Sequence, residues 1–115
     1  MTILTCLREL QDRGAKKYPA IVTIHVRRCA LADRHHRKSL RAYMHVNHVA
    51  DPLVICYAAA TSKLPRKNIL GLLAHEIGHI MSGAASQAVA DDTALFLFGV
   101  PVLYDDRRVE YMEVP

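Results

Sequence analysis

The sequence predicts a single α+β domain in which helices surround a small antiparallel or mixed sheet. Its 115 residues suit one domain with a modest core. Apolar residues recur at helical spacing in three segments, and β-branched or alternating segments lie between the first two of these. No repeat, low-complexity segment or Gly/Ser linker divides the chain, so residues 1–115 are expected to form one unit.

The first half of the chain is predicted to be a helix followed by strands. Residues 2–13 carry apolar side chains at helical spacing. The β-branched run at residues 20–26 predicts a strand. Residues 42–60 alternate and then become apolar, which predicts a hairpin that turns at Asp51 and Pro52.

The second half is predicted to be two helices and a short hairpin. The helical period returns over residues 62–83, and Gly83 suits the end of that helix. A second helix is expected from Ser86, which is a suitable N-cap, to about residue 98. Residues 102–114 then read as two short strand-like pieces.

Composition favours a soluble, cytoplasmic protein. The hydrophobic fraction of 51% and the charged fraction of 23% are ordinary for globular domains. No apolar stretch approaches the ~20 residues of a spanning helix, and charged residues interrupt the N-terminus before a signal-peptide core forms. Cys6, Cys29 and Cys56 are odd in number and lack C-x-x-C spacing, so they are expected to be buried or half-buried thiols in a reducing compartment.

The net charge of +4 is concentrated in residues 27–41, which hold six Arg or Lys and two His. Such a segment can bind nucleic acid by its charge. It has no interleaved aromatic residues before Tyr43 and no known reading motif, so we expect a solvated basic loop and no specific nucleic-acid site.

The segment LLAHEIGHIMSG, residues 72–83, holds an H-E-x-x-H motif within an apolar helix. His75 and His79 are four residues apart and therefore share one helix face, where both can bind a Zn²⁺ ion at ~2.0–2.1 Å. Glu76 follows the first ligand and points beside the metal, where a general base can take a proton from zinc-activated water. Gly78 allows another segment to approach closely.

These residues resemble the motif of the zincin metallopeptidases, and in particular the gluzincins and the small soluble peptidases of the ImmA/IrrE kind. The resemblance covers about residues 64–101. It implies a minimal zincin-like fold and a zinc-dependent endopeptidase. In these families a second helix with the pattern E-x-x-A-D supplies a glutamate as third zinc ligand, and its aspartate supports a zinc-binding histidine.

The second helix departs from that pattern. Ala90 and Asp91 match the Ala-Asp pair, but Gln87 stands at the glutamate position, and Val89 occupies the alternative one. An amide oxygen is uncharged and is a poorer zinc ligand than a carboxylate. We therefore expect Asp91 to be the third ligand, and Gln87 is the alternative ligand. If Asp91 does not bind the metal, its next expected role is to support a motif histidine, and its last is to cap the helix. Asp92 is about 100° away around the helix and is expected to be exposed or to serve as a charge near the helix N-terminus.

Other candidate residues are weaker. His25, His45 and His48 lie on predicted strands and are expected to be half-exposed strand residues, although a histidine facing the cleft can steady an oxyanion. Tyr104 is a similar candidate.

The function predicted from the sequence is a zinc-dependent endopeptidase acting on a peptide or protein substrate, which adds as a strand along the edge of the 42–60 hairpin. Two alternatives remain open. One is a zincin-like regulatory or interaction protein without turnover, which Gln87 and Val89 favour. The other is a basic nucleic-acid-binding domain with a structural zinc. Glu76 argues against both, since a structural site needs no base. The sequence assigns no membrane association and no oligomeric state.

Overall fold

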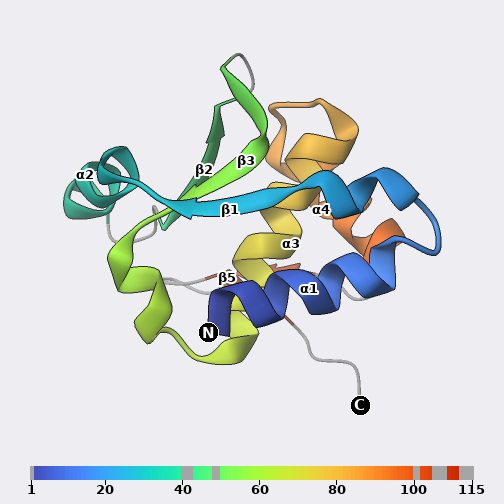
Figure 1. Ribbon diagram of the computed structural model, residues 1–115, viewed down its shortest axis with the longest axis horizontal. Coiled ribbons are helices and arrows are strands. Elements are labelled where there is room, and N and C mark those ends of the chain that lie inside the picture. Colours follow the sequence, from blue (N-terminus) through green and yellow to red (C-terminus); the bar gives the residue numbers. More distant parts are fainter. Residues whose placement is uncertain (1, 40–42, 48–49, 100–101, 105–108, 112–115) are drawn as a thin grey trace.

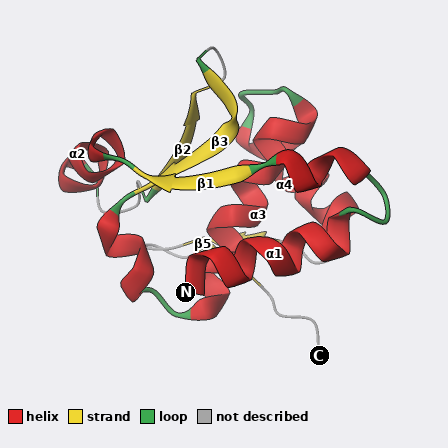
Figure 2. Cartoon of the chain, in the orientation of Figure 1, coloured by secondary structure: helices red, strands yellow, loops and turns green. Residues whose placement is uncertain are grey.

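The computed structural model describes residues 2–39, 43–47, 50–99, 102–104 and 109–111 (Figure 1). Its helices are α1 (Thr2–Gly14), α2 (Ala30–Lys38), α3 (Arg66–Ser82) and α4 (Gln87–Phe98), with 3₁₀ helices η1 (Pro19–Thr23) and η2 (Ala59–Lys63). Its strands are β1 (His25–Arg28), β2 (Met44–Asn47), β3 (Asp51–Tyr57), β4 (Val102–Tyr104) and β5 (Val109–Tyr111). The predicted α+β class, with an N-terminal helix and a small mixed sheet, is confirmed (Figure 2).

The main sheet has an apolar inner face and a polar outer face. Its strand order is β1–β3–β2, with β1 parallel and β2 antiparallel to the central strand β3. Val26, Ile55 and Val46 are aligned across the three strands and join the hydrophobic core. Because side chains alternate along a strand, the next aligned set, which includes His45 and Cys56, faces away from the core. The inner face thus packs on the helices, whereas the outer face is available for other chemistry.

Helix α3 is the centre of the molecule. Most of its residues from Asn68 to His79 are buried, and it packs against α1, α4 and the sheet (Figure 1). Helix α1 contributes Ile3 and Leu10, both fully buried, to the same core. Among the described residues, no helix is both long enough and apolar enough to cross a membrane. The apolar character of α3 reflects burial on all sides within the fold.

The ends of α3 and α4 follow the predicted signals. Gly83 ends α3 with a φ of 67°, and its backbone N–H bonds to the carbonyl of His79 at 3.0 Å. Only glycine adopts this left-handed conformation without a steric cost. Ser86 then caps α4, because its hydroxyl accepts a hydrogen bond from the backbone of Val89 at 3.3 Å. The short reversal between the two helices places the start of α4 beside the end of α3.

The prediction of a strand over residues 20–26 is wrong in its first part. Residues Pro19–Thr23 form the 3₁₀ helix η1, and the strand begins only at His25. Pro19 fixes φ at a helical value in the first turn, and Ile21 is completely buried against the core. Tertiary packing of Ile21 therefore overrides the β propensity of this run.

The hairpin is confirmed, but it does not turn at the predicted residues. Asp51 and Pro52 belong to β3. The Asn47 side chain accepts a hydrogen bond from the backbone of Ala50 at 3.0 Å, so the chain turns before Asp51.

The prediction of a solvated loop is wrong for the described part of the basic segment, since residues 27–28 belong to β1 and residues 30–38 form a helix, while residues 40–41 lie outside the described residues. The central part of this segment is α2, in which Ala32 is the buried residue, while the cationic side chains Arg34, Arg37 and Lys38 are exposed. Asp33 fixes the position of the helix, since its carboxylate accepts a hydrogen bond from the backbone of Ala59 at 2.8 Å. The segment is therefore an amphipathic helix on the outer face of the sheet, with a solvated basic side.

Candidate metal centre

The two histidines of the motif converge on one point. His75 and His79 lie one turn apart on α3, and both are buried, with exposed fractions of 7% and 8%. Their Nε2 atoms are 3.0 Å apart, and their rings are nearly perpendicular, at 88°. Two nitrogens at ~2.0–2.1 Å from one tetrahedral ion would lie about 3.3 Å apart. The side chains are thus already close to the arrangement of two ligands of a single ion.

The proton positions on these two rings follow from their other hydrogen bonds. His79 Nδ1 lies 2.8 Å from the carbonyl oxygen of Ala84, and His75 Nδ1 lies 2.7 Å from Oδ1 of Asp91. A carbonyl and a carboxylate only accept hydrogen bonds, so each Nδ1 must carry the proton and donate it. A neutral imidazole has one such proton, so when both rings are neutral their Nε2 atoms present lone pairs to one another. Two facing lone pairs repel unless a cation lies between them, and this donor set fits a divalent metal ion.

Helix α4 completes the arrangement with a matching pair of side chains. Gln87 and Asp91 are four residues apart and share a face of α4, opposite the histidine pair of α3. Gln87 Oε1 lies 2.8 Å from Nε2 of His79, and Asp91 bonds to His75. Gln87 therefore brings a third lone-pair atom to the point where the two Nε2 atoms meet.

Gly78 permits this close approach of the two helices. A Cβ atom at Gly78 would lie 2.1 Å from the backbone carbonyl oxygen of Ala90, a separation that real contacts do not show. The prediction that Gly78 lets another segment approach is confirmed, and the segment is α4. Any larger residue would separate the histidine pair from Gln87 and Asp91.

Asp91 bonds to a motif histidine, which is the contact expected of its alternative, supporting role. Its carboxylate lies beside Nδ1 of His75, on the opposite side of the ring from the Nε2 atom that faces His79. Asp91 thus has the supporting contact that was the next alternative, and the residue at the convergence point is Gln87, the alternative ligand. The physical reason is the register of the two helices, which pairs the first turn of α4 with the last turn of α3. Asp92 is exposed, as predicted.

Glu76 lies next to the first histidine and is half-buried. Burial raises the pKa of Glu76 from its ordinary value to about 7, and the nearby His79 partly opposes this rise. A carboxyl group with a pKa near neutrality exchanges a proton readily at physiological pH, as a general base must. Within the described part of the chain, its carboxylate forms no side-chain hydrogen bond that would hold it away from such a role.

The other histidines predicted as weaker candidates lie elsewhere. His25 is exposed on β1, and His45 is half-buried on the outer face of the sheet, away from the core. His48 lies outside the described residues, and Tyr104 lies in β4, where only the backbone is described.

A second group of metal-binding side chains lies on that outer face, and sequence reasoning missed it. Cys29, His45 and Cys56 bring one ligand atom each to within 4.8 Å of one another, so this group could hold a metal ion. As predicted, Cys6 and Cys56 are buried thiols and Cys29 is half-buried. The burial of Cys29 raises its thiol pKa. The three residues are far apart in sequence, and only the strand register that pairs His45 with Cys56 could have indicated their proximity.

The structure thus brings together four of the residues that the sequence singled out, namely His75, His79, Gln87 and Asp91, on two facing helices, with Glu76 beside them. The i,i+4 spacing of Gln87 and Asp91, which equals that of the two histidines, is the signal that predicts their pairing. Comparison of the chain with protein-family models, with curated proteins and with solved structures finds no match.

Proposed function

We propose that this protein is a zinc-dependent peptidase whose metal is held by His75, His79 and the amide oxygen of Gln87. The observation that carries the proposal is the convergence of the Nε2 atoms of His75 and His79, 3.0 Å apart, beside a third donor atom, the Gln87 amide oxygen, 2.8 Å from one of them. Imidazole and oxygen donors suit Zn²⁺. Three protein ligands also leave a position open, as in catalytic zinc sites and unlike closed structural ones.

When bound, the zinc ion would polarise the substrate carbonyl and make a water molecule acidic enough to attack it near neutral pH. Glu76 acts as the general base that takes a proton from the attacking water, for which a pKa of about 7 suits it. The same carboxyl group can then deliver that proton to the leaving amine. Asp91 accepts the Nδ1 proton of His75 at 2.7 Å, which fixes the ring and increases the basicity of Nε2.

Strand β2 is proposed to bind the substrate. It lies at an edge of the described sheet and packs against α3, the helix that carries the motif. An edge strand offers unpaired backbone groups to which an extended peptide can add as a further strand. Such pairing would recognise the peptide backbone, consistent with an endopeptidase.

The neutral ligand Gln87 limits the proposed activity. Two imidazoles and an amide bring no charge to the metal, and the carboxylate of Asp91 acts through His75. A carboxylate at position 87 would hold zinc more tightly. We therefore infer that the chain binds zinc more weakly than a three-ligand site with a charged oxygen. A zincin-like protein without turnover is the alternative that this feature favours.

The test compares wild-type protein with Glu76→Gln, which is nearly isosteric and lacks the basic carboxylate. Both are loaded with zinc and incubated with a complex peptide mixture from a whole-proteome digest, and new peptide termini are counted by mass spectrometry. Glu76→Gln should retain the zinc of the wild type and cut about 10²–10⁴-fold more slowly.

Two outcomes would contradict this proposal. Equal cleavage by both proteins would assign the activity to a contaminant or to another site. Zinc binding with no new termini from the wild type would favour the non-catalytic alternative. A His75→Ala/His79→Ala variant is the matched control, because it should lose both the zinc of this site and the cleavage.

A further inference from the structure

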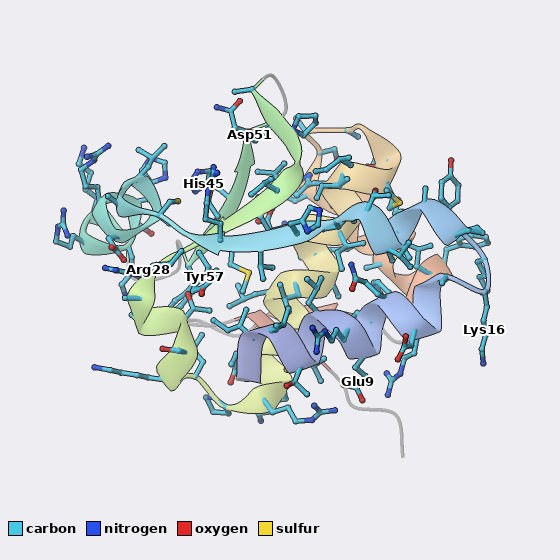
Figure 3. The ribbon with its side chains drawn as sticks, in the orientation of Figure 1. Glu9, Lys16, Arg28, His45, Asp51 and Tyr57 are labelled. Atoms are coloured by element: carbon cyan, nitrogen blue, oxygen red, sulfur yellow. The ribbon has the colours of Figure 1, made fainter. Side chains whose placement is uncertain are left out.

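The outer face of the main sheet carries a cluster of thiols and imidazole that the proposed peptidase site does not use. Cys29, His45 and Cys56 each offer a ligand atom within 4.8 Å of the other two. They come from three elements: the residue before α2, strand β2 and strand β3. His45 and Cys56 are direct neighbours in the antiparallel register. In Figure 3, His45 and Tyr57 lie on opposite sides of β1, with α1 on the Tyr57 side, so the cluster faces away from the core.

The backbone holds these three side chains in place. Cys29 is the N-cap residue of α2, and its N–H bonds to the carbonyl of Tyr57 at 3.2 Å, which ties the end of β1 to β3. Arg27 pairs with Cys56 in the parallel register, so both side chains point to the same face of the sheet. Cys29 follows two residues after Arg27 in extended backbone, so its side chain points to that face too. Cys29 and Cys56 therefore point to the same face of the sheet, where His45 also lies.

We propose that Cys29, His45 and Cys56 form a second zinc site, which tethers α2 to the sheet. Thiolate sulfur and imidazole nitrogen are the preferred donors for Zn²⁺, with ligand atoms ~3.3–3.8 Å apart around a tetrahedral ion, within the 4.8 Å of this cluster. Binding releases the thiol protons to solvent and leaves the fourth position to a water molecule or another small ligand. The site differs from the α3 centre in its donors, because it contains sulfur.

The structure also gives a reason for such a tether. Helix α2 buries Ala32 but leaves its other side chains partly or fully exposed, so apolar packing contributes little to its attachment. Its contacts with the rest of the fold include the hydrogen bond from Ala59 to Asp33 and the ring contacts of His35 with His45 and of His36 with Tyr43. A metal ion that joins the N-cap of α2 to β2 and β3 would supply the stabilisation that the apolar contacts lack.

The test separates this site from the α3 centre by its ligand chemistry. Purified protein carrying His75→Ala/His79→Ala is loaded under reducing conditions with Zn²⁺, for metal counting, or with Co²⁺, for spectroscopy. Thiolate ligands give Co²⁺ an intense near-ultraviolet charge-transfer absorption that imidazole and amide ligands do not give. We expect this variant to bind one metal ion per chain and to show that absorption. Adding Cys29→Ser should abolish both.

Cys29→Ser is chosen because serine is a favourable N-cap residue, so α2 should still form and loss of metal cannot be attributed to misfolding. Cys6→Ala is the matched control, since Cys6 lies in α1 within the core and should leave metal content unchanged. The proposal is overturned if the histidine double variant binds no metal, if its cobalt complex lacks the thiolate absorption, or if Cys29→Ser retains both. If instead the α3 centre binds no metal, the results with the histidine double variant stay the same. The Cys29→Ser protein with native histidines would then contain no metal.

Discussion

At the scale of single residues, the candidate centre depends on where two protons lie. The Ala84 carbonyl and the Asp91 carboxylate hold the Nδ1 protons of His79 and His75, and so leave both Nε2 atoms with lone pairs. The Ala84 carbonyl reaches His79 because Gly83 reverses the chain immediately after α3. A glycine outside the motif therefore helps to determine the tautomer of a neutral histidine inside it, and with it the ring nitrogen that can bind a metal.

Asp91→Asn tests the role of Asp91 at this scale. The asparagine can still accept the Nδ1 proton of His75 but carries no charge, so zinc should bind with unchanged stoichiometry and about 10–100-fold lower affinity. Asp92→Asn is the matched control, since Asp92 is the exposed neighbour and should leave affinity unchanged. Zinc affinity is measured by competition with a chromophoric chelator. Complete loss of the α3-centre metal in Asp91→Asn, measured in a Cys29→Ser background, would return Asp91 to the role of direct ligand.

At the scale of elements, the centre is a contact between two antiparallel helices. The His75–Asp91 and His79–Gln87 contacts both require the backbones of α3 and α4 to approach closely, and Gly78 against Ala90 is the point of closest approach. Ser86 fixes the register, because its cap begins α4 one residue before Gln87. Packing of the helices and geometry of the metal site are thus one property of this helix pair.

Gly78→Ala is predicted to weaken both the packing of α4 on α3 and the binding of zinc. The added Cβ would meet the Ala90 carbonyl at 2.1 Å, so α4 must shift, at a cost of about 1–3 kcal/mol or more in unfolding free energy. The shift should also weaken zinc binding. Gly99→Ala is the control at the other end of α4: its φ of 73° makes an alanine strained, but nothing lies within 4 Å of the added atom. It should lower stability in urea unfolding and leave zinc affinity unchanged. Equal zinc affinity in the two variants would contradict the close-approach argument.

At the scale of the whole molecule, the two faces of the main sheet are stabilised differently. The inner face packs with α1, α3 and α4 in one hydrophobic core, whereas α2 contacts the rest of the fold through the Asp33 hydrogen bonds, two histidine ring contacts and the single buried side chain of Ala32. Asp33 is central to these contacts, accepting hydrogen bonds from the Ala59 backbone at 2.8 Å and from Arg28 at 2.9 Å. The hydrogen bond from Ala59, followed by the charge of Arg28, lowers the pKa of Asp33 below its ordinary value.

The lowered pKa of Asp33 predicts that the contribution of its carboxylate to stability depends on pH. Since the folded-state pKa of Asp33 is lowered, its contribution to stability is fully present above the unfolded value of 3.8 and is lost as pH falls through the lower folded value. Metal-free Asp33→Asn should therefore unfold at lower urea concentration than metal-free wild type near neutral pH, with the gap narrowing in acid. Asp51→Asn is the control, because Asp51 forms an exposed ion pair with Arg27 and should change little at any pH. A gap that is unchanged in acid would show that the Asp33 carboxylate charge contributes nothing.

The sequence by itself determined the α+β class, the helix ends at Gly83 and Ser86 and the facing of His75 and His79, because periodicity and capping act over a few neighbouring residues. Tertiary structure alone decided three other features. Burial of Ile21 turned the start of a predicted strand into η1, and the register of α4 on α3 set Gln87 beside Nε2 of His79 and Asp91 beside Nδ1 of His75. Strand pairing brought His45 to Cys56. Each of these depends on contacts between segments distant in sequence, which local patterns do not encode.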